Sequence, residues 1–489
     1  MKSLLLGSVA LIAFNSATHA ADLAARYTKA PAPVSAAYNW TGFYLSAGGG
    51  YGLWQADQQS TDPFNPGIGE RTGGRGYFGT VGGGYDWQFA PKWVAGVFGD
   101  AQFGDIKGNF DVDTHTATAA IKNNLSYAAG ARLGYLIAPN ALSYVNVGYS
   151  HADFSGGQLF YAPSGSDSGH GVPKMHFNGW FLGGGVENSL DLFGISAPGL
   201  FMKTEYRVAE YDRRSEAIGP LGGVAVTSSF KPYVQTVSTS LVYRFNSDGA
   251  PARAVSAPLY TKAPAAHVNW TGFYLSGGGG YGLWAADQQS TSAFSFPAGQ
   301  VSPSSRTGGR GYFGTVGGGY DWQINPTWVV GVFGDAQFGD IKGTYNIQSA
   351  ADTGTTKNNI SYAAGARLGY LVAPNVLSYV NAGYSHADFS GSVLTSPSGA
   401  PVGYTIPKTH YDGWFLGGGV ENSLDMFGLS APGWFMKTEY RVAEYNRKTA
   451  DFLSGTTPGG TISFKPYVQT VSTSLVYRFN WGSPVAAKY

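Results

Sequence analysis

The chain has 489 residues, no cysteine and a formal net charge of +1. The lack of cysteine excludes disulfide bonds and thiolate metal sites, and the near-neutral charge argues against nucleic-acid binding, which leaves a basic footprint. Charged residues make up only 12% of the chain, whereas a typical soluble domain has roughly 25%. Aromatic residues reach 15% and glycine occurs 72 times, a composition that is unusual for a soluble globular protein.

The N-terminal segment, residues 1–20, is typical of a secretory signal peptide. Lys2 supplies a positive charge, residues 4–14 form an apolar run, and the segment ends at Ala20 in a suitable cleavage site. The apolar run is shorter than the roughly 20 residues that a membrane-spanning helix needs. We therefore expect export and cleavage after Ala20, which leaves residues 21–41 as a periplasmic leader.

The rest of the chain is duplicated with a period of about 230 residues, far longer than the 20–50 residues of solenoid repeats. The segment NWTGFYLS at residues 39–46 returns at 269–276, and residues 229–246 return unchanged as 463–480. The repeat predicts two domain-sized copies with a linker and a tail. The predicted parts are copy 1 at residues 42–246, an Ala/Pro-rich linker at 247–269, copy 2 at 270–480 and a C-terminal tail at 481–489.

Eight strands are predicted in the first copy, each of about 12 to 15 residues, which exceeds the roughly 9–11 that cross a bilayer at a tilt. They cover residues 42–54, 76–88, 92–104, 123–137, 141–153, 177–191, 200–211 and 233–246. In the seventh strand, Lys203, Glu205 and Arg207 share one face, and Met202, Tyr206 and Val208 lie on the other. Because a charge that faces lipid at mid-bilayer costs roughly 2–4 kcal/mol, the charged face is predicted to be the interior of a barrel.

The connections between these strands alternate between short and long. Short periplasmic turns and long outer loops are typical of outer-membrane barrels. The short connections are residues 89–91, 138–140 and 192–199, and the long ones are 55–75, 105–122, 154–176 and 212–232. Aromatic residues near the strand ends predict two interfacial belts: Phe43, Trp87, Trp93 and Phe245 on the periplasmic side, and Tyr77, Trp180 and Tyr233 on the outer side.

With this layout, the opening WTGFYLSAGGGYG at residues 40–52 and the closing LVYRF at 241–245 resemble a known family. The chain is similar to the small outer-membrane β-barrels of alphaproteobacteria, the "porin family" or outer-membrane immunogenic proteins, which share the architecture of the OmpA transmembrane domain. Family members usually carry one barrel and end on an aromatic residue that the insertion machinery recognises. Phe245 and Phe479 match that residue, although residues 480–489 follow Phe479.

The resemblance implies an integral protein of the cell outer membrane that is not an enzyme and has a structural or surface-display role with at most weak pore activity. The expected fold is all-β, with two tandem eight-stranded antiparallel barrels. One sixteen-stranded barrel that acts as a diffusion channel is the alternative, and a surface ligand-binding or adhesion protein is a second one. Expected partners are outer-membrane lipid and lipopolysaccharide, with periplasmic chaperones and the insertion machinery during biogenesis.

Alternation places a balanced set of charges inside each copy, where they would form a polar plug or line a narrow ion path. In the first copy these are Asp86, Asp100, Glu187, Glu205, Arg132, Lys203, Arg207 and Arg244. In the second they are Asp321, Asp335, Glu421, Glu439, Arg367, Lys437, Arg441 and Arg478. An eight-stranded barrel is just wide enough for side chains to fill, so we favour the plug.

No catalytic, cofactor or metal site is predicted. The sequence SHAD at residues 150–153 holds a nucleophile, a base and an acid, but adjacent strand residues point to opposite faces, so a polar rim is the better interpretation. His170 and His176 fall in a long loop with no carboxylate or cysteine at ligand spacing. The glycine triplets at 48–50 and 82–84 do not open a helix after a strand, so nucleotide binding is not expected.

Overall fold

A computed structural model describes most of both copies. The described residues are 38–64, 69–112, 117–161, 164–245, 269–292, 301, 304–347, 352–396, 398–429 and 431–479. The predicted signal peptide, nearly all of the leader and of the linker, and the C-terminal tail lie outside these residues and stay predictions. No helix of the described residues is long and apolar enough to cross a membrane.

In the first copy, eight long antiparallel strands pair in chain order, and the last strand pairs with the first. They are β1 (Gly42–Thr61), β2 (Glu70–Ala90), β3 (Trp93–Val112), β4 (Ala117–Ala138), β5 (Ala141–Phe154), β8 (Met175–Ser189), β9 (Leu200–Tyr211) and β11 (Val224–Arg244). The closing pair β1–β11 runs in continuous register from Tyr44↔Arg244 to Thr61↔Thr227. These strands therefore form a closed ring, which we call the first ring.

The second copy repeats this pairing as the second ring. Its long strands are β12 (Gly272–Ser292), β13 (Ser305–Gln323), β14 (Trp328–Ile347), β15 (Asp352–Ala373), β16 (Val376–Phe389), β19 (Thr409–Ser423), β20 (Trp434–Tyr445) and β22 (Thr457–Arg478). Its closing pair β12–β22 runs from Tyr274↔Arg478 to Ser292↔Gly460. The prediction of an all-β antiparallel fold is confirmed. A sixteen-stranded ring would pair β11 with β12, and the pairings of the described residues contain no such pair.

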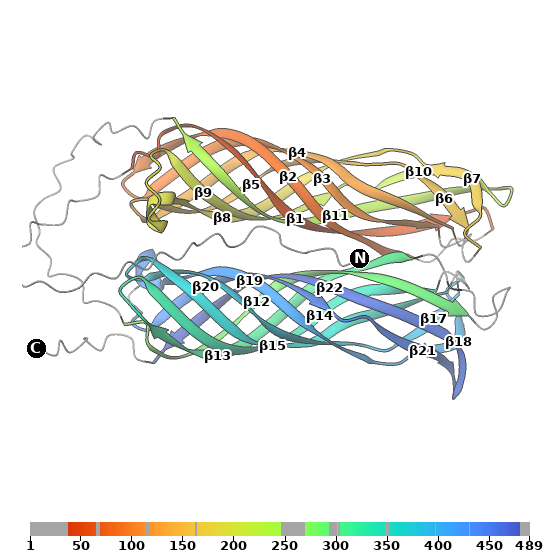
Figure 1. Cartoon of the computed structure of the whole chain (residues 1–489). Helices are drawn as coiled ribbons and strands as arrows, with labels where there is room; N and C mark the ends of the chain where they lie inside the picture. Colours follow the sequence, from red (N-terminus) through yellow and green to blue (C-terminus); the bar gives the residue numbers. More distant parts are fainter. Residues whose placement is uncertain are drawn as a thin grey trace, which may run out of the picture. The chain divides into compact units, whose positions relative to one another are not determined.

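Short elements complete the two ends of each ring. They are β6 (Gly157–Tyr161), β7 (Asp167–Val172), β10 (Arg214–Leu221) and η1 (Leu190–Phe193) in the first ring, and β17 (Ser392–Thr395), β18 (Pro401–Ile406), β21 (Lys448–Ser454) and η2 (Leu424–Phe427) in the second. In the first ring, β6, β7 and β10 lie at the end opposite the tight turns (Figure 1). We call these two ends the extended end and the short-turn end.

Several strands reach further toward the extended end than predicted. β11 begins at Val224 and β1 continues to Thr61, in segments that were expected to be loops. These segments keep the period-2 alternation, because Val226, Ser228 and Phe230 are buried while the residues between them, Thr227 and Ser229, are more exposed. The two extensions pair with each other, so their backbone groups are satisfied as in the rest of the ring.

The two faces of the strands have the predicted character over the middle of each ring. On β11, the outward Leu241 is 55% exposed, whereas the inward Val242 and Arg244 are buried. The interior is crowded, which explains its glycines: a Cβ on Gly84 would lie 2.7 Å from the hydroxyl oxygen of Tyr44. Gly82 and Gly84 therefore make room for the lumen side chains Asp100 and Tyr44, whereas Gly83 faces outward beside Leu45.

Candidate functional site

The short-turn end of the first ring holds two arginines between two carboxylates. Arg132 on β4 donates from Nε to Asp86 Oδ1 over 2.9 Å and from Nη1 to Glu187 Oε2 over 3.2 Å, and a further bond joins its Nη2 to Asp86. Arg244 on β11 donates from Nε to Glu187 Oε1 over 2.7 Å and from Nη2 to Asp86 Oδ2 over 2.8 Å. All four residues are at most 4% exposed. We call this set the ionic layer.

Aromatic side chains cover the ionic layer on the side that faces the short turns. Trp40, which precedes β1, is 1% exposed, and its indole N–H donates to the carbonyl of Pro139 over 3.3 Å. The guanidinium carbon of Arg244 lies 4.4 Å from the centre of the Trp40 ring, and that of Arg132 lies 4.5 Å from the Tyr44 ring. The charges are therefore covered by cation–π contacts instead of water.

A second charged layer lies further along the lumen. Arg207 on β9 donates to both carboxylate oxygens of Asp100 on β3, over 3.0 and 2.7 Å, and to Glu205 Oε1 over 2.7 Å. The other oxygen of Glu205 accepts hydrogen bonds from Tyr144 and Asn146. Arg207 and Glu205 are 6% exposed, so this layer is also nearly dry.

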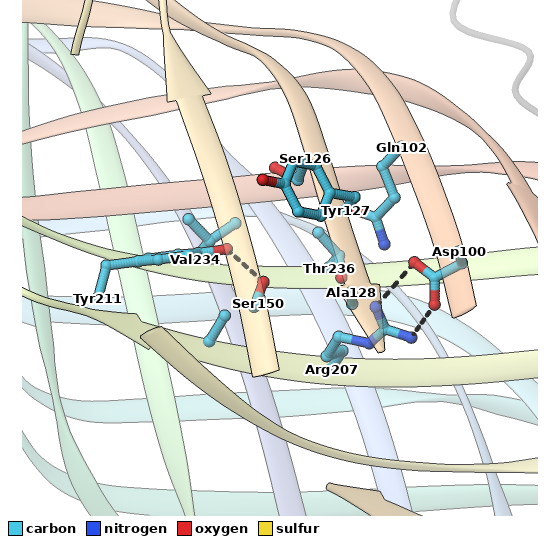
Figure 2. A pocket seen from close by; sticks show the side chains of 11 residues that line it. Asp100, Gln102, Ser126, Tyr127, Ala128, Ser150, Arg207, Tyr211, Val234 and Thr236 are labelled. Atoms are coloured by element: carbon cyan, nitrogen blue, oxygen red, sulfur yellow. Dashed lines mark hydrogen bonds and ion pairs between the residues drawn. The ribbon is translucent and has the colours of Figure 1, made fainter. Parts of the chain in front are cut away.

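A small cavity of about 20 Å³ lies beside this second layer, which is room for a single water molecule. Figure 2 shows the Arg207–Asp100 pair at one side of the cavity and the hydrogen bond between Ser150 and Tyr211 at the other. Tyr211 is 3% exposed, so the cavity is walled off by buried side chains on this side. The cavity is too small for a hydrated ion or a metabolite.

An apolar cluster fills part of the lumen toward the extended end, beside buried, hydrogen-bonded polar side chains such as Gln58 and Ser228, and alternation alone did not predict it. Trp54, Phe154, Phe177 and Phe230 are each at most 1% exposed and pack edge-to-face or tilted at 5.4–5.8 Å between ring centres. Phe154 and Phe230 fall in segments that were predicted to be long loops, so their packing inside the ring was not predicted. The inward face of these segments packs as the core of a soluble barrel does.

The second ring repeats these contacts. Arg367 and Arg478 bind Asp321 and Glu421, and Arg441 binds Asp335 and Glu439. Its cavity, beside Arg441, measures about 10 Å³.

The structure places fourteen of the sixteen predicted lumen charges in these two pairs of layers. The other two, Lys203 and Lys437, are half-buried and form no ion pair with the residues that the structure describes. Sequence reasoning missed the role of Trp40, which it placed in the leader, and of its counterpart Trp270, which it placed at the first position of copy 2. The sequence feature that could have indicated this role is the NWTG segment, which opens both copies.

The predicted belt residues and terminal aromatics are exposed, apart from Tyr233, which is half-buried. The belt residues Phe43, Trp87 and Trp93 are exposed on the outward face at the short-turn end, and Tyr77 and Trp180 are exposed nearer the extended end. Phe245 and Phe479 follow the last strand of each ring and are 49% and 55% exposed.

A cluster of histidine and carboxylate side chains lies on the outward face toward the extended end. Strand pairing sets Asp153 directly opposite His176, and His151 opposite Asn178. Asp153 Oδ1 lies 2.8 Å from His151 Nε2 and 2.6 Å from His176 Nδ1. We call His151, Asp153 and His176 the first rim cluster.

The second ring has the same arrangement in His386, Asp388 and His410, which we call the second rim cluster. Asp388 Oδ1 lies 3.1 Å from His386 Nε2 and also bonds His410 Nδ1. In each cluster the three ligand atoms lie within 4.8 Å of one another. The reason given for expecting no metal at His176 was therefore wrong: His176 lies in β8 and not in a loop, and pairing with β5 supplies its carboxylate partner.

Comparison with known proteins agrees with this fold. Residues 253–479 match a family described as "Outer membrane protein beta-barrel domain". The chain is 24% identical over 226 residues to a 31 kDa outer-membrane immunogenic protein of Brucella melitensis, covering 46% of this chain and 89% of that protein. It is 27% identical over 248 residues to a 25 kDa outer-membrane immunogenic protein of Brucella canis, covering 50% of this chain and 99% of that protein.

Among solved structures, a FadL homologue of Pseudomonas aeruginosa matches with 9% identity and a TM-score of 0.26, covering 90% of this chain and 91% of that one. With the family match over residues 253–479, the outer-membrane relatives and the two rings of antiparallel strands, the chain is an outer-membrane β-barrel protein, located in the cell outer membrane.

Proposed function

We propose that the protein is a non-enzymatic, non-conducting outer-membrane barrel protein that has a structural role and displays its extended ends at the cell surface. The observation that carries this proposal is the ionic layer. Asp86 and Glu187 are fully buried, and each is bound by both Arg132 and Arg244. The equivalent four residues fill the second ring, so both lumens are closed by the same kind of ion-pair layer.

Opening such a lumen has a high energetic cost. An ion that crosses the layer would have to separate buried, hydrogen-bonded charge pairs, and removing one partner of a buried pair costs roughly 3–5 kcal/mol. The apolar cluster around Trp54 and Phe230 forms a second barrier, because a bare ion gains no solvation there. A diffusion channel would need a water-filled path through both the ionic layer and the apolar cluster.

The outward face supports lasting contact with lipid. Exposed aromatic residues near both ends suit the interfacial regions of a bilayer, and apolar residues such as Leu182 and Val147 lie exposed between them. The exposed aromatics after the last strands, Phe245 and Phe479, are the side chains through which we propose that the insertion machinery recognises each ring.

Conductance tests the proposal. The full chain, purified in detergent and inserted into planar bilayers, should give no large, steady channels, whereas a general porin measured in the same chamber should give them. Large and steady channels from the unaltered chain would show that the lumens are open and would overturn the proposal.

A further inference from the structure

We propose that each rim cluster is a binding site for a divalent first-row transition metal ion such as Zn²⁺. The ligands would be His151 Nε2, Asp153 Oδ1 and His176 Nδ1 in the first ring, and His386 Nε2, Asp388 Oδ1 and His410 Nδ1 in the second. Two imidazoles and one carboxylate are the ligands of many zinc and iron sites, and they leave further coordination positions open for water.

The spacing of the donor atoms suits an ion between them. In the first cluster the aspartate oxygen is 2.8 and 2.6 Å from the two histidine nitrogens. Zinc bonds of about 2.0–2.1 Å at tetrahedral angles require ligand atoms about 3.3 Å apart. Each oxygen–nitrogen contact would therefore lengthen by about 0.5 to 0.7 Å, and the two histidine nitrogens, which lie within 4.8 Å of each other, would take the same separation.

Both ring nitrogens of His386 in the second cluster face a carboxylate oxygen. Its Nδ1 lies 2.8 Å from Asp412 Oδ1, and its Nε2 lies 3.1 Å from Asp388 Oδ1. When Nδ1 carries the N–H and donates it to Asp412, Nε2 presents a lone pair beside Asp388 Oδ1, as a metal ligand requires. A metal ion bound at His386 Nε2 would also coordinate Asp388 Oδ1, so the two atoms would become ligands of the same ion.

Neighbouring side chains hold the proposed ligands in a suitable orientation. Nδ1 of His151 faces Asn178 Oδ1 at 2.7 Å, as Nδ1 of His386 faces Asp412. A hydrogen bond from the second ring nitrogen to an amide or carboxylate oxygen is the usual support of a metal-binding histidine. In the second cluster, Lys408 occupies Asp388 Oδ2 at 2.8 Å, which leaves Oδ1 as the coordinating oxygen.

Both clusters are open to the surroundings. The side chains of His176 and His410 are 58% and 54% exposed, so ions can reach them without opening the ring. The rings differ around these histidines, with Met175, Phe177 and Asn178 replaced by Thr409, Tyr411 and Asp412, but the three ligands are the same in both.

Zinc binding to the untagged, detergent-purified full chain tests this inference. After removal of metals with a chelator, equilibrium dialysis against micromolar ZnCl₂ should load one ion into each ring. H176N should lose half of the bound zinc and H176N/H410N nearly all of it. Co²⁺ should give visible absorption bands with the unaltered chain that the double variant lacks.

H170N is the matched control, because His170 lies in β7 and outside both clusters. It should keep the full zinc content, and slower migration on gels after boiling should show that every variant is folded. The inference is overturned if the unaltered chain binds no zinc at micromolar concentration, or if the folded double variant binds as much as the unaltered chain.

Discussion

Arg132 and Asp86 form their ion pair across an intervening strand, over the bare backbone of Gly96. Gly96 on β3 pairs with Asp86 on one side and with Arg132 on the other. A Cβ at this position would lie 2.1 Å from Asp86 Oδ1 and 3.0 Å from the carbonyl oxygen of Tyr85. The ion pair therefore depends on glycine, and Gly331 has the same role between Asp321 and Arg367 in the second ring.

Replacing Gly96 by valine should push the Asp86 carboxylate away from Arg132 and destabilise the first ring. We expect the free energy of unfolding to fall by about 3–5 kcal/mol, the range for a broken buried pair. Urea unfolding in lipid vesicles, followed by tryptophan fluorescence, measures this change. Gly99→Ala is the control on the same strand, because its nearest neighbour would lie 3.7 Å from the new Cβ. Equal losses in both variants would contradict the role assigned to Gly96.

Removing the guanidinium of Arg132 should both destabilise the ring and open its lumen. In Arg132→Ala, Asp86 and Glu187 keep only Arg244 as a charged partner, so the stability loss should again approach about 3–5 kcal/mol, and less if water enters the lumen. Planar-bilayer recordings should show conductance that the unaltered chain lacks. Lys203→Gln removes a lumen charge that forms no ion pair with the described residues and should change stability by less than about 1 kcal/mol. An Arg132→Ala protein as stable as the parent would show that the layer is not a plug.

Alternation along single strands was the basis for predicting which charges enter the lumen. Arg244, for example, alternates with Tyr243 and Phe245 in the sequence, and the structure buries it while they stay exposed. Alternation says nothing about the register between strands, however. The pairing of Arg132 with Asp86 depends on register across β3, so the sequence predicted the set of charges but not the pairs.

The sequence did not predict the rim clusters for the same reason: it does not give the register between strands. Asp153 and His176 are 23 positions apart, and only the register of β5 against β8 sets them opposite each other. The apolar cluster toward the extended end was missed for a different reason. Residues 227–229 are Thr, Ser and Ser and residue 232 is Pro, types that are common in loops, and the burial of this segment depends on the partner extension at residues 55–61.

The first copy should fold without the second. Every long strand of the first ring finds both of its neighbours within residues 42–244, including the closing pair of β1 and β11. We expect residues 21–246, refolded alone into detergent, to be rich in β-structure and to migrate faster on gels before boiling than after. Residues 21–140, which lack half of the ring, are the control and should not fold, because their open edges would face lipid. If residues 21–246 fail to fold while the full chain folds, the rings depend on each other.

Insertions should distinguish the two ends of the ring in living cells. Gly165 lies in the hairpin between β6 and β7 at the extended end, adopts a φ of 68° and has no heavy atom within 4 Å of a potential Cβ, so a peptide tag there meets open space. Pro91 lies in the tight turn between β2 and β3, where its carbonyl accepts a hydrogen bond from Gln88. Long loops accept insertions and face outward in outer-membrane barrels, whereas tight turns face the periplasm.

An antibody should therefore label intact cells that carry the tag at Gly165, and should label the tag at Pro91 only after the outer membrane is permeabilised. Labelling of intact cells through Pro91, with none through Gly165, would invert the orientation and place the rim clusters on the periplasmic side.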